Sequence, residues 1–238
     1  HLVAHPEIPE HVAITRADGH FGTWMARYVC AHLLFEAQRL APCAAAQAET
    51  RWDPKLQPED LGGALALIVG YGRIGRRIGE ALRSLGLTVQ GFVRTPRPDP
   101  DVPLSDLGAL PEALPRARLL VLCAPLTEAT RGLVNARLLA RGHDRLTLVN
   151  VGRGALVVTQ DLLEALDHGR LGRAVLDVFE TEPLPPTSPL WRHPKVVVTP
   201  HHSGPSTPKD LIPDILENLR AYAEGRPIQG AVDRRRGY

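Results

Sequence analysis

The stretch "LALIVGYGRIGRRIGEAL" (65–82) decides the fold of this chain. It opens with a nearly unbroken apolar run, which is typical of a strand buried on both faces of a parallel sheet. Three glycines follow, at Gly70, Gly72 and Gly75, and apolar residues then recur at helical spacing as far as Leu85. The stretch therefore predicts a strand, a tight glycine turn and a helix in direct succession.

The spacing G-x-G-x-x-G between a strand and a helix is typical of a turn that binds a dinucleotide. Gly70 permits the tight turn, Gly72 lets the backbone approach a pyrophosphate, and Gly75 lets the helix pack closely on the strand. The first turn of the helix offers N–H groups to the phosphates, so Arg73 and Ile74 join the expected cofactor contacts. A purely structural glycine turn is the alternative, but the position between strand and helix favours the nucleotide.

The loop after the second predicted strand indicates which dinucleotide to expect. An NAD site usually has Asp or Glu about 20 residues after the glycines, where it accepts a hydrogen bond from the ribose 2′-hydroxyl. This chain has no Asp or Glu between Ala81 and Pro98, and offers Arg94, Thr95 and Arg97 instead. Guanidinium groups suit a 2′-phosphate, so we expect NADP (NADPH) as the preferred cofactor. NAD is one alternative, and a solvated basic turn without a ligand is the other.

Further apolar runs of strand length alternate with helical patterns along the chain. The runs lie at residues 87–93, 118–124, 145–151, 173–179 and 195–200. One intervening helix is predicted over Thr159–His168, with Thr159 as N-cap and Gly169 just past its end. The alternation predicts the α/β class, a doubly wound parallel Rossmann sheet of six strands. The Pro-rich stretch 94–103 is predicted to be a rigid surface loop.

Two more helices flank the predicted sheet. Residues 22–40 predict one long helix that is apolar nearly all round, and such a helix is buried or lies at a subunit interface. Residues 207–224 predict a second helix, with Pro208 in its first turn and Gly225 beyond its end. Pro213 is expected to interrupt or kink this helix.

The composition excludes several other classes of protein. The 238 residues carry a net charge of only +2, which argues against a nucleic-acid partner. No apolar run approaches the ~20 residues of a membrane span, and the chain opens without the pattern of a signal peptide. Three scattered cysteines suit neither a disulfide framework nor a metal site. We therefore expect a cytoplasmic protein without nucleic-acid, membrane or metal binding.

Several segments together resemble the D-isomer-specific 2-hydroxyacid dehydrogenase family. They read "GYGRIGRRIGEAL", "CAPLTEATRGLVN", "VNVGRGALV", "LLEALDHGRLGRAVLDVFETEPLP" and "SPLWRHPKVVVTPH", in the family's order and spacing. The motif "SPLW-HP", the basic loop and the ending "VDRRRGY" are similar to the glyoxylate/hydroxypyruvate reductase branch, which uses NADPH. The resemblance implies a Rossmann domain, a flavodoxin-like substrate domain and a homodimer.

The resemblance also implies a set of catalytic residues. Arg153, in "GRG", matches the arginine that binds the substrate, and a guanidinium can grip the carboxylate and keto oxygens together. His201 matches the proton donor, and Glu182 the acid that pairs with it. Glu180 lies nearby, but the family places the acid directly before the proline. Glutamate at position 182 also argues against the formate-oxidising branch, which has glutamine there.

Other loop positions are carried over from the family as cofactor contacts. They are Cys123, Ala124, Pro125, Thr130, Val151, Gly152 and Asp177. Asp177 matches an aspartate near the nicotinamide carboxamide, and a cap at the end of its strand is the alternative role.

The chain departs from the family at its front. We expect residues 1–20 to be a remnant of the substrate domain, 21–202 the dinucleotide-binding domain, and 203–238 a helix and tail that return to the substrate domain. The family has ~100 residues where this chain has about 20, a difference of nearly one small domain. Either the protein lacks that segment, or this chain is part of a longer protein. His202 and Ser203 depart as well, because the family more often has an apolar residue after the histidine.

The sequence thus predicts an oxidoreductase that reduces small 2-keto acids, such as glyoxylate and hydroxypyruvate, with NADPH. Another D-2-hydroxyacid dehydrogenase that uses NAD is one alternative, and a dinucleotide-sensing, corepressor-like module of the same fold is the other. In "TPHHSGPST" (199–207) only one histidine is expected to face Glu182, because successive side chains of an extended segment point to opposite sides. The motif assigns that place to His201.

Overall fold

The computed structural model describes residues 7–9, 11–16, 21–205 and 207–232. Part of the expected N-terminal remnant (1–20) and most of the basic ending, residues 233–238, lie outside the described residues.

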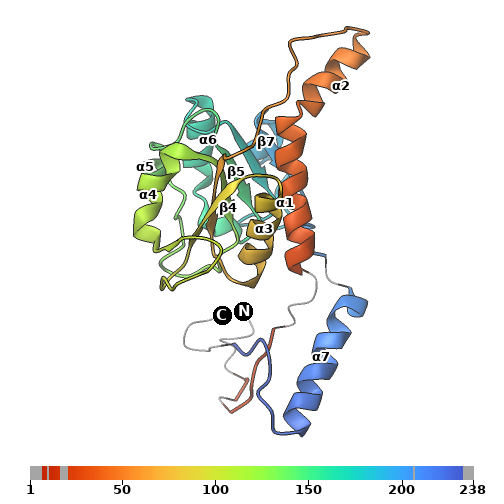
Figure 1. The fold of residues 1–238 in the computed structure, drawn as a ribbon, viewed down its shortest axis with the longest axis vertical. Helices are drawn as coiled ribbons and strands as arrows, with labels where there is room; N and C mark the ends of the chain where they lie inside the picture. Colours follow the sequence, from red (N-terminus) through yellow and green to blue (C-terminus); the bar gives the residue numbers. More distant parts are fainter. Residues whose placement is uncertain (1–6, 10, 17–20, 206, 233–238) are drawn as a thin grey trace.

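One parallel sheet of seven strands forms the centre of the molecule, in the order β3-β2-β1-β4-β5-β6-β7 (Figure 1). Its strands are β1 (Leu65–Val69), β2 (Thr88–Phe92), β3 (Leu104–Ser105), β4 (Ala117–Leu122), β5 (Thr147–Asn150), β6 (Arg173–Leu176) and β7 (Val196–Val198). Every neighbouring pair is parallel. The predicted doubly wound Rossmann fold is confirmed, with the strand order reversing between β1 and β4.

Helices cover both faces of this sheet and also extend beyond it. The helices of the described residues are α1 (Phe21–Ala37), α2 (Leu40–Ala48), α3 (Arg73–Ser84), α4 (Leu110–Ala113), α5 (Ala136–Leu139), α6 (Thr159–Asp167) and α7 (Pro208–Ala223). Short 3-10 helices are η2 (Leu107–Ala109), η3 (Leu114–Arg116), η4 (Gly154–Leu156) and η5 (Pro189–Arg192). Helices α1 and α3 pack on one face, and α4, α5 and α6 on the other. Successive residues of β4 alternate between the two cores, as the period of a strand requires.

The structure differs from the sequence prediction at several elements. Strand β3 has only two residues and follows the Pro-rich loop, so it carried no recognisable strand pattern. The predicted helix 22–40 ends at Ala37, and α2 begins at Leu40 after a left-handed Arg39. Pro42 explains the restart, because proline fits the first turn of a new helix but lacks the N–H that would continue the old one.

The predicted ends of the other two helices were partly right. Thr159 is the first residue of α6 and not its N-cap, while Gly169 follows the helix in the left-handed conformation as expected. Helix α7 runs through Pro213 without interruption, so the predicted break is wrong. Pro208 and Gly225 mark its start and end as expected.

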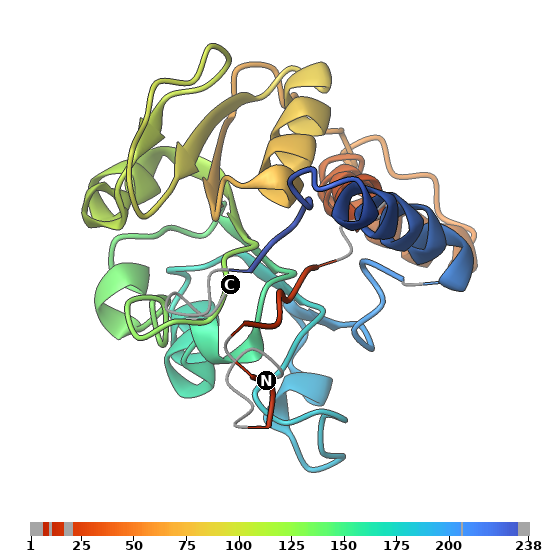
Figure 2. The ribbon, with the colours of Figure 1, turned by 90° about the horizontal axis from the view of Figure 1, so that it is seen from below.

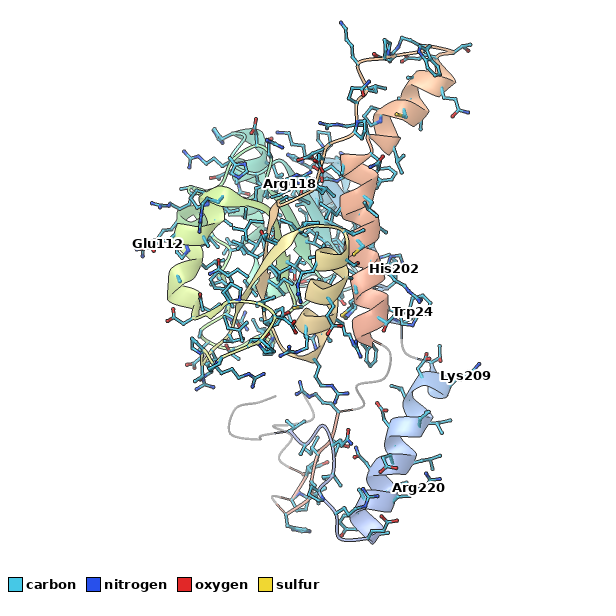
Figure 3. The ribbon with its side chains drawn as sticks, viewed as in Figure 1. Trp24, Glu112, Arg118, His202, Lys209 and Arg220 are labelled. Carbon is cyan, nitrogen blue, oxygen red and sulfur yellow. The ribbon has the colours of Figure 1, made fainter. Side chains whose placement is uncertain are left out.

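A buried ion network closes the amino edge of the sheet. Arg118, at the start of β4, is only 6% exposed (its position is labelled in Figure 3). Its guanidinium pairs with Glu36 of α1 at 3.1 Å and with Glu59 at 2.9 Å, and donates to the Thr147 hydroxyl at 2.8 Å. The hydrogen bond from Arg118 lowers the pKa of Glu59, so the network keeps its charge. Ion pairs within the protein thus occupy this edge of the sheet. The opposite, carboxyl edge is the one at which such folds bind ligands.

Two segments from opposite ends of the chain lie beyond the carboxyl edge of the sheet. They are residues 7–9 and 11–16, and helix α7 with residues 226–232 (Figure 1), and they are nearest the viewer when the molecule is seen from below (Figure 2). Thr15 and Ala231 form an antiparallel bridge, in which Arg16 N–H donates to the Gly230 carbonyl at 2.9 Å. The two distant ends of the chain are therefore joined to each other. Within the described residues, no helix has both the length and the apolar character needed to cross a membrane.

Candidate functional site

The residues expected to bind cofactor and substrate lie in loops at the carboxyl edge of the sheet. One loop follows each of β1, β2, β4, β5, β6 and β7. In doubly wound folds ligands bind at this edge, next to the point where the strand order reverses. The fold thus collects at one edge residues that are up to about 130 positions apart in the chain.

The glycine turn after β1 has the geometry that its sequence requires. Gly70 is in the left-handed region at φ 94°, and a Cβ there would lie 2.6 Å from Ala124, across the switch point. A Cβ at Gly75 would collide with the Gly70 carbonyl oxygen. At Gly72, the N-cap of α3, no atom lies within 4 Å of an added Cβ. Two glycines therefore hold the turn together, and the third keeps the helix N-terminus open.

Arg73 and Ile74 occupy the first two positions of α3, so their N–H groups belong to the open first turn. The next arginine, Arg76, was not predicted to have a role. It forms an ion pair at 2.6 Å with Asp99, at the far end of the basic loop, and lowers the pKa of that carboxyl. This contact ties the loop after β2 to the helix that begins at the glycine turn.

Arg94, Thr95 and Arg97 are all exposed in the loop after β2. They lie on the β2 side of the glycine turn, where the adenosine half of a dinucleotide binds in such folds. The structure keeps them apart from Arg153, Glu182 and His201, which follow strands on the other side of the switch point.

The loop after β4 is held mainly by its own contacts. The Cys123 thiol donates to the Gly70 carbonyl at 3.2 Å, and burial raises the pKa of this thiol to about 12. The Thr130 hydroxyl donates to the Pro125 carbonyl and accepts from the Thr127 N–H, both at 2.8 Å. Ala124 is buried against the glycine turn. These contacts shape the loop, and direct cofactor binding by its residues stays a prediction.

The loop that carries Arg153 is organised by Asn150, which sequence reasoning missed. Asn150 is 1% exposed at the end of β5. Its side chain accepts from the Gly152 N–H at 3.1 Å and donates to the Arg153 carbonyl at 3.0 Å. Val151 and Gly152 are buried, whereas Arg153 is exposed and donates to the Gly152 carbonyl at 2.6 Å. An asparagine directly after a buried strand was the available signal, because its side chain readily organises a turn.

Gly154 brings this loop against the loop after β6. A Cβ at Gly154 would overlap the backbone of Phe179 and Glu180. Phe179 in turn donates its N–H to Glu182 Oε1 at 2.8 Å. The loop of Arg153 and the carboxylate of Glu182 are thereby linked through one close backbone contact, which only glycine permits.

Glu182 and His201 come together although 18 residues separate them in the chain. His201 Nδ1 lies 2.7 Å from Glu182 Oε2. Burial acts to raise the pKa of Glu182, but the hydrogen bonds from His201 and from the Phe179 N–H outweigh it, so the pKa is lowered. A carboxylate at Nδ1 fixes the ring tautomer and leaves Nε2 for a ligand. No such contact involves Glu180, so the geometry selects Glu182 of the two acids among the described residues.

The backbone at His201 is not extended, so the prediction that strand alternation separates the two histidine side chains is wrong. His201 is in the left-handed region at φ 52°, and its N–H donates to the Thr199 carbonyl at 3.0 Å. The chain bends there, and the His202 ring (labelled in Figure 3) lies edge-on to Tyr28 of α1, with ring centres 5.8 Å apart. A tight turn, not strand alternation, sends the two side chains to different partners.

Asp177 lies at the end of β6 and is fully buried. Its Oδ1 accepts from the Thr199 hydroxyl at 2.6 Å and from the His202 N–H at 2.9 Å, and its Oδ2 accepts from the Ser203 N–H at 2.9 Å. The carboxylate thus caps the turn of the histidines, and its contact with a nicotinamide stays a prediction. In the part of the chain that the structure describes, no three His, Cys, Asp or Glu gather as metal ligands.

Together these features define a class of protein. A parallel doubly wound sheet with an open glycine turn at its switch point is a dinucleotide-binding Rossmann domain. A histidine paired with a carboxylate at the same edge, with an exposed arginine in an adjoining loop, would suit a dehydrogenase that acts on carbonyl or hydroxyl groups.

The chain belongs to the D-isomer specific 2-hydroxyacid dehydrogenase family. The family's NAD binding domain matches residues 30–203, which is most of the chain. The protein is therefore an NAD(P)-dependent oxidoreductase, as its sequence predicted.

Curated relatives point to one branch of this family. The chain is similar to glyoxylate/hydroxypyruvate reductase A of Escherichia fergusonii, with 35% identity over 100% of this chain and 77% of the relative. The enzyme of the same name from Klebsiella pneumoniae strain 342 is also 35% identical, over 98% of this chain and 76% of its own length.

Solved structures agree with this placement. A D-isomer specific 2-hydroxyacid dehydrogenase of Xanthobacter autotrophicus Py2, in complex with NADPH and MES, matches with a TM-score of 0.89 and 37% identity over 100% of this chain and 98% of that one. The NADPH-dependent glyoxylate/hydroxypyruvate reductase of Sinorhizobium meliloti, in complex with NADP and sulfate, matches with a TM-score of 0.91 and 32% identity over 100% of this chain and 77% of that one.

Proposed function

We propose that this protein reduces small 2-keto acids, such as glyoxylate and hydroxypyruvate, to 2-hydroxy acids with NADPH. The observation that carries the proposal is the 2.7 Å contact between His201 and Glu182 at the edge where the dinucleotide fold binds its ligands. The similarity to reductases of these two substrates supports the choice of substrate class.

The side chains of the site divide the chemistry among them. Arg153 binds the carboxylate and keto oxygens of the substrate and polarises the carbonyl group. The reduced nicotinamide, when bound, supplies the hydride for the carbonyl carbon. His201 gives its Nε2 proton to the oxygen that becomes an alkoxide, and the neutral ring keeps its Nδ1 proton. Glu182 accepts that Nδ1 hydrogen bond, which orients the ring and stabilises its charged form.

The cofactor site fits a dinucleotide with a 2′-phosphate. The open N-terminus of α3 would hold the pyrophosphate, because no protein atom lies within 4 Å of the position that a Cβ at Gly72 would take. Arg94, Thr95 and Arg97 would hold the 2′-phosphate. The NADPH and NADP complexes of similar proteins support this preference over NAD. Asp177, Thr130, Val151 and the loop 123–125 are proposed to line the rest of the site.

The proposed domain division follows the expected one. Residues 21–202 form the dinucleotide-binding domain, and residues 1–20 and 203–238 belong to a second domain that holds the other side of the cleft. The bridge between Thr15 and Ala231 supports this grouping, because it joins the two chain ends to each other.

A homodimer and a cytoplasmic location are proposed as well. Helix α1 keeps Trp24 and Phe35 partly exposed, at 42% and 37%, although it packs on the sheet with its other face. Such apolar side chains favour an interface with a second copy. The free thiols of Cys30, Cys43 and Cys123 suit a reducing compartment.

The test is consumption of NADPH, followed by absorbance, with the protein and either glyoxylate or hydroxypyruvate. Turnover is expected with both, with a higher kcat/KM for NADPH than for NADH. Absence of turnover with every 2-keto acid tried would contradict the proposal. NADPH binding without turnover, measured by calorimetry, would favour the dinucleotide-sensing alternative.

A further inference from the structure

A series of hydrogen bonds between the half-buried Tyr28 and Thr199 and the fully buried Asp177 runs from α1 to the turn that carries His201. The Tyr28 hydroxyl lies 2.7 Å from Thr199 Oγ1, and Thr199 Oγ1 lies 2.6 Å from Asp177 Oδ1. A carboxylate oxygen only accepts hydrogen bonds, so the single proton of the Thr199 hydroxyl is committed to Asp177. The Thr199 oxygen therefore accepts a hydrogen bond from Tyr28. Each group in the series donates to the next, from Tyr28 to Thr199 to Asp177.

Asp177, at the last position of this series of hydrogen bonds, holds the backbone of the histidine turn in place. Asp177 accepts from two consecutive N–H groups, those of His202 and Ser203, each at 2.9 Å. Consecutive N–H groups that converge on one carboxylate hold the backbone of that segment in place. His201, directly before these two residues, is in the left-handed region. The carboxylate thus stabilises the bend that turns the His201 ring toward Glu182.

Tyr28, at the first position of this series, is also held by ring contacts. The Tyr28 ring contacts the His202 ring edge-on at 5.8 Å and the His32 ring at 4.5 Å. Burial raises the pKa of Tyr28, and the hydrogen bond with Thr199 offsets only part of this rise. The phenol keeps its proton at any working pH and remains a donor.

We propose that Tyr28 and Thr199 are positioning residues for the proton transfer by His201, acting through Asp177. Neither hydroxyl touches His201 or Glu182 in the structure. They restrict the Asp177 carboxylate to the orientation in which it caps the turn, so that His201 Nδ1 stays within hydrogen-bond reach of Glu182. This inference rests on the proposed function, in which His201 is the proton donor. It adds helix α1, which carries Tyr28, to the elements that position the reacting groups.

The experiment compares variants that remove one hydroxyl each. Tyr28→Phe keeps the ring contacts with His202 and His32, and Thr199→Val keeps the shape of the side chain. Thr199→Ser keeps the hydroxyl. Thr147→Val is the control, because Thr147 is a buried threonine of β5 that bonds to Arg118 and Glu36 at the opposite edge of the sheet.

Thr199→Val is expected to lower kcat about ten- to a hundredfold with NADPH and glyoxylate, because small misplacements of a reacting group have effects of this size. Tyr28→Phe is expected to lower kcat by a smaller factor, on the order of tenfold or less. The KM for NADPH should stay near its original value in both, and Thr199→Ser should restore most of kcat. Thr147→Val should lower the melting temperature and leave kcat unchanged.

Two results would overturn the proposal. One is a kcat that stays unchanged in Thr199→Val and Tyr28→Phe while stability falls as in Thr147→Val, which would make the network structural only. The other is an effect confined to the KM for NADPH. If the unaltered protein itself shows no turnover, the proposed function fails, and the positioning is tested by NMR of the His201 ring nitrogens. Their signals should shift in Thr199→Val and stay in place in Thr147→Val, and unchanged signals in Thr199→Val would contradict the positioning.

Discussion

The two sides of the switch point are built by different means. On the β1–β2 side, the glycine turn consists almost wholly of backbone, and its determinants are consecutive in the chain at Gly70, Gly72 and Gly75. On the β5–β7 side, the pair of Glu182 and His201 depends on side chains from separate loops. Those loops are in turn held by Asn150, Gly154 and Asp177.

This difference predicts how strongly a single substitution should affect each half of the site. A backbone site fails when one position acquires a side chain that does not fit. A side-chain site fails gradually, because each supporting contact contributes a part of the geometry. The following changes test this contrast, from the largest expected effect to the smallest.

His201→Asn should lower kcat by about 10²- to 10⁴-fold, because asparagine has no proton to give near neutral pH. His202→Asn should change mainly the KM for the keto acid, because the His202 ring contacts Tyr28 and lies away from Glu182. Steady-state kinetics with NADPH and glyoxylate check both. A larger loss of kcat in His202→Asn would reverse the roles of the two histidines.

Gly70→Ala should destabilise the fold by more than about 2 kcal/mol, because it combines a left-handed residue with a Cβ placed 2.6 Å from Ala124. Gly72→Ala is its matched partner, since an added Cβ there meets no protein atom. It should leave stability within about 0.5 kcal/mol and still weaken NADPH binding. Urea unfolding and calorimetry separate the two effects, and equal stabilities would refute the structural role of Gly70.

Arg94→Ala should raise the KM for NADPH about tenfold or more and leave the KM for NADH nearly unchanged, because only NADPH carries the 2′-phosphate. Arg77→Ala is the control, because Arg77 is an exposed arginine of α3 that pairs with Glu80. Kinetics with both cofactors provide the measurement. Equal changes in the KM for NADPH and for NADH would contradict the proposal that Arg94 binds the 2′-phosphate.

The contact of Glu182 with His201 should persist into mild acid. The pKa of Glu182 is lowered from its usual 4.5 in the folded protein. Its contribution to stability is therefore fully present above pH 4.5 and is lost as the pH falls through the lowered pKa. The stability difference between the unaltered protein and Glu182→Gln should not shrink above about pH 5.5 and should shrink below 4.5. A difference that shrinks already near neutral pH would mean that the carboxyl pKa is raised.

Ser203→Ala should have the smallest effect. The Ser203 hydroxyl is buried and has no hydrogen-bond partner among the described residues, while its N–H is bound by Asp177. Removing an unsatisfied hydroxyl should leave the free energy of unfolding unchanged or raise it by up to about 1 kcal/mol. Thermal and urea unfolding provide the measurement, and a clear loss of stability would show that the hydroxyl has a bound water as partner.

The sequence predicted much of the fold because the relevant signals are local. Six of the strands are continuous apolar runs, and the glycine turn is a single motif. Strand β3 escaped notice because two residues after a Pro-rich loop carry no pattern. The break between α1 and α2 was not predicted, because the apolar pattern of residues 22–40 runs across it and Pro42 lies beyond that pattern.

The sequence predicted the main residues of the candidate site. It did not predict the residues that hold them in place. The resemblance named Glu182 and His201, but Asn150, Gly154 and the link between Tyr28 and Thr199 had no signal of comparable strength. Tyr28 lies 171 residues before Thr199, and no local rule joins two such positions. The left-handed turn at His201 was likewise invisible, since the motif alone suggested an extended segment.

By itself, the sequence determined where the chain forms strands, where it turns on glycine and which cofactor class it suits. Those properties depend on neighbouring residues, whose periodicity and conformational freedom are local. Only the tertiary structure decided how the turn at His201 directs the two histidine rings, how Asp177 is used, and which helix supports the reacting turn. Those properties depend on distances between segments far apart in the chain, which packing of the sheet and its helices alone can fix.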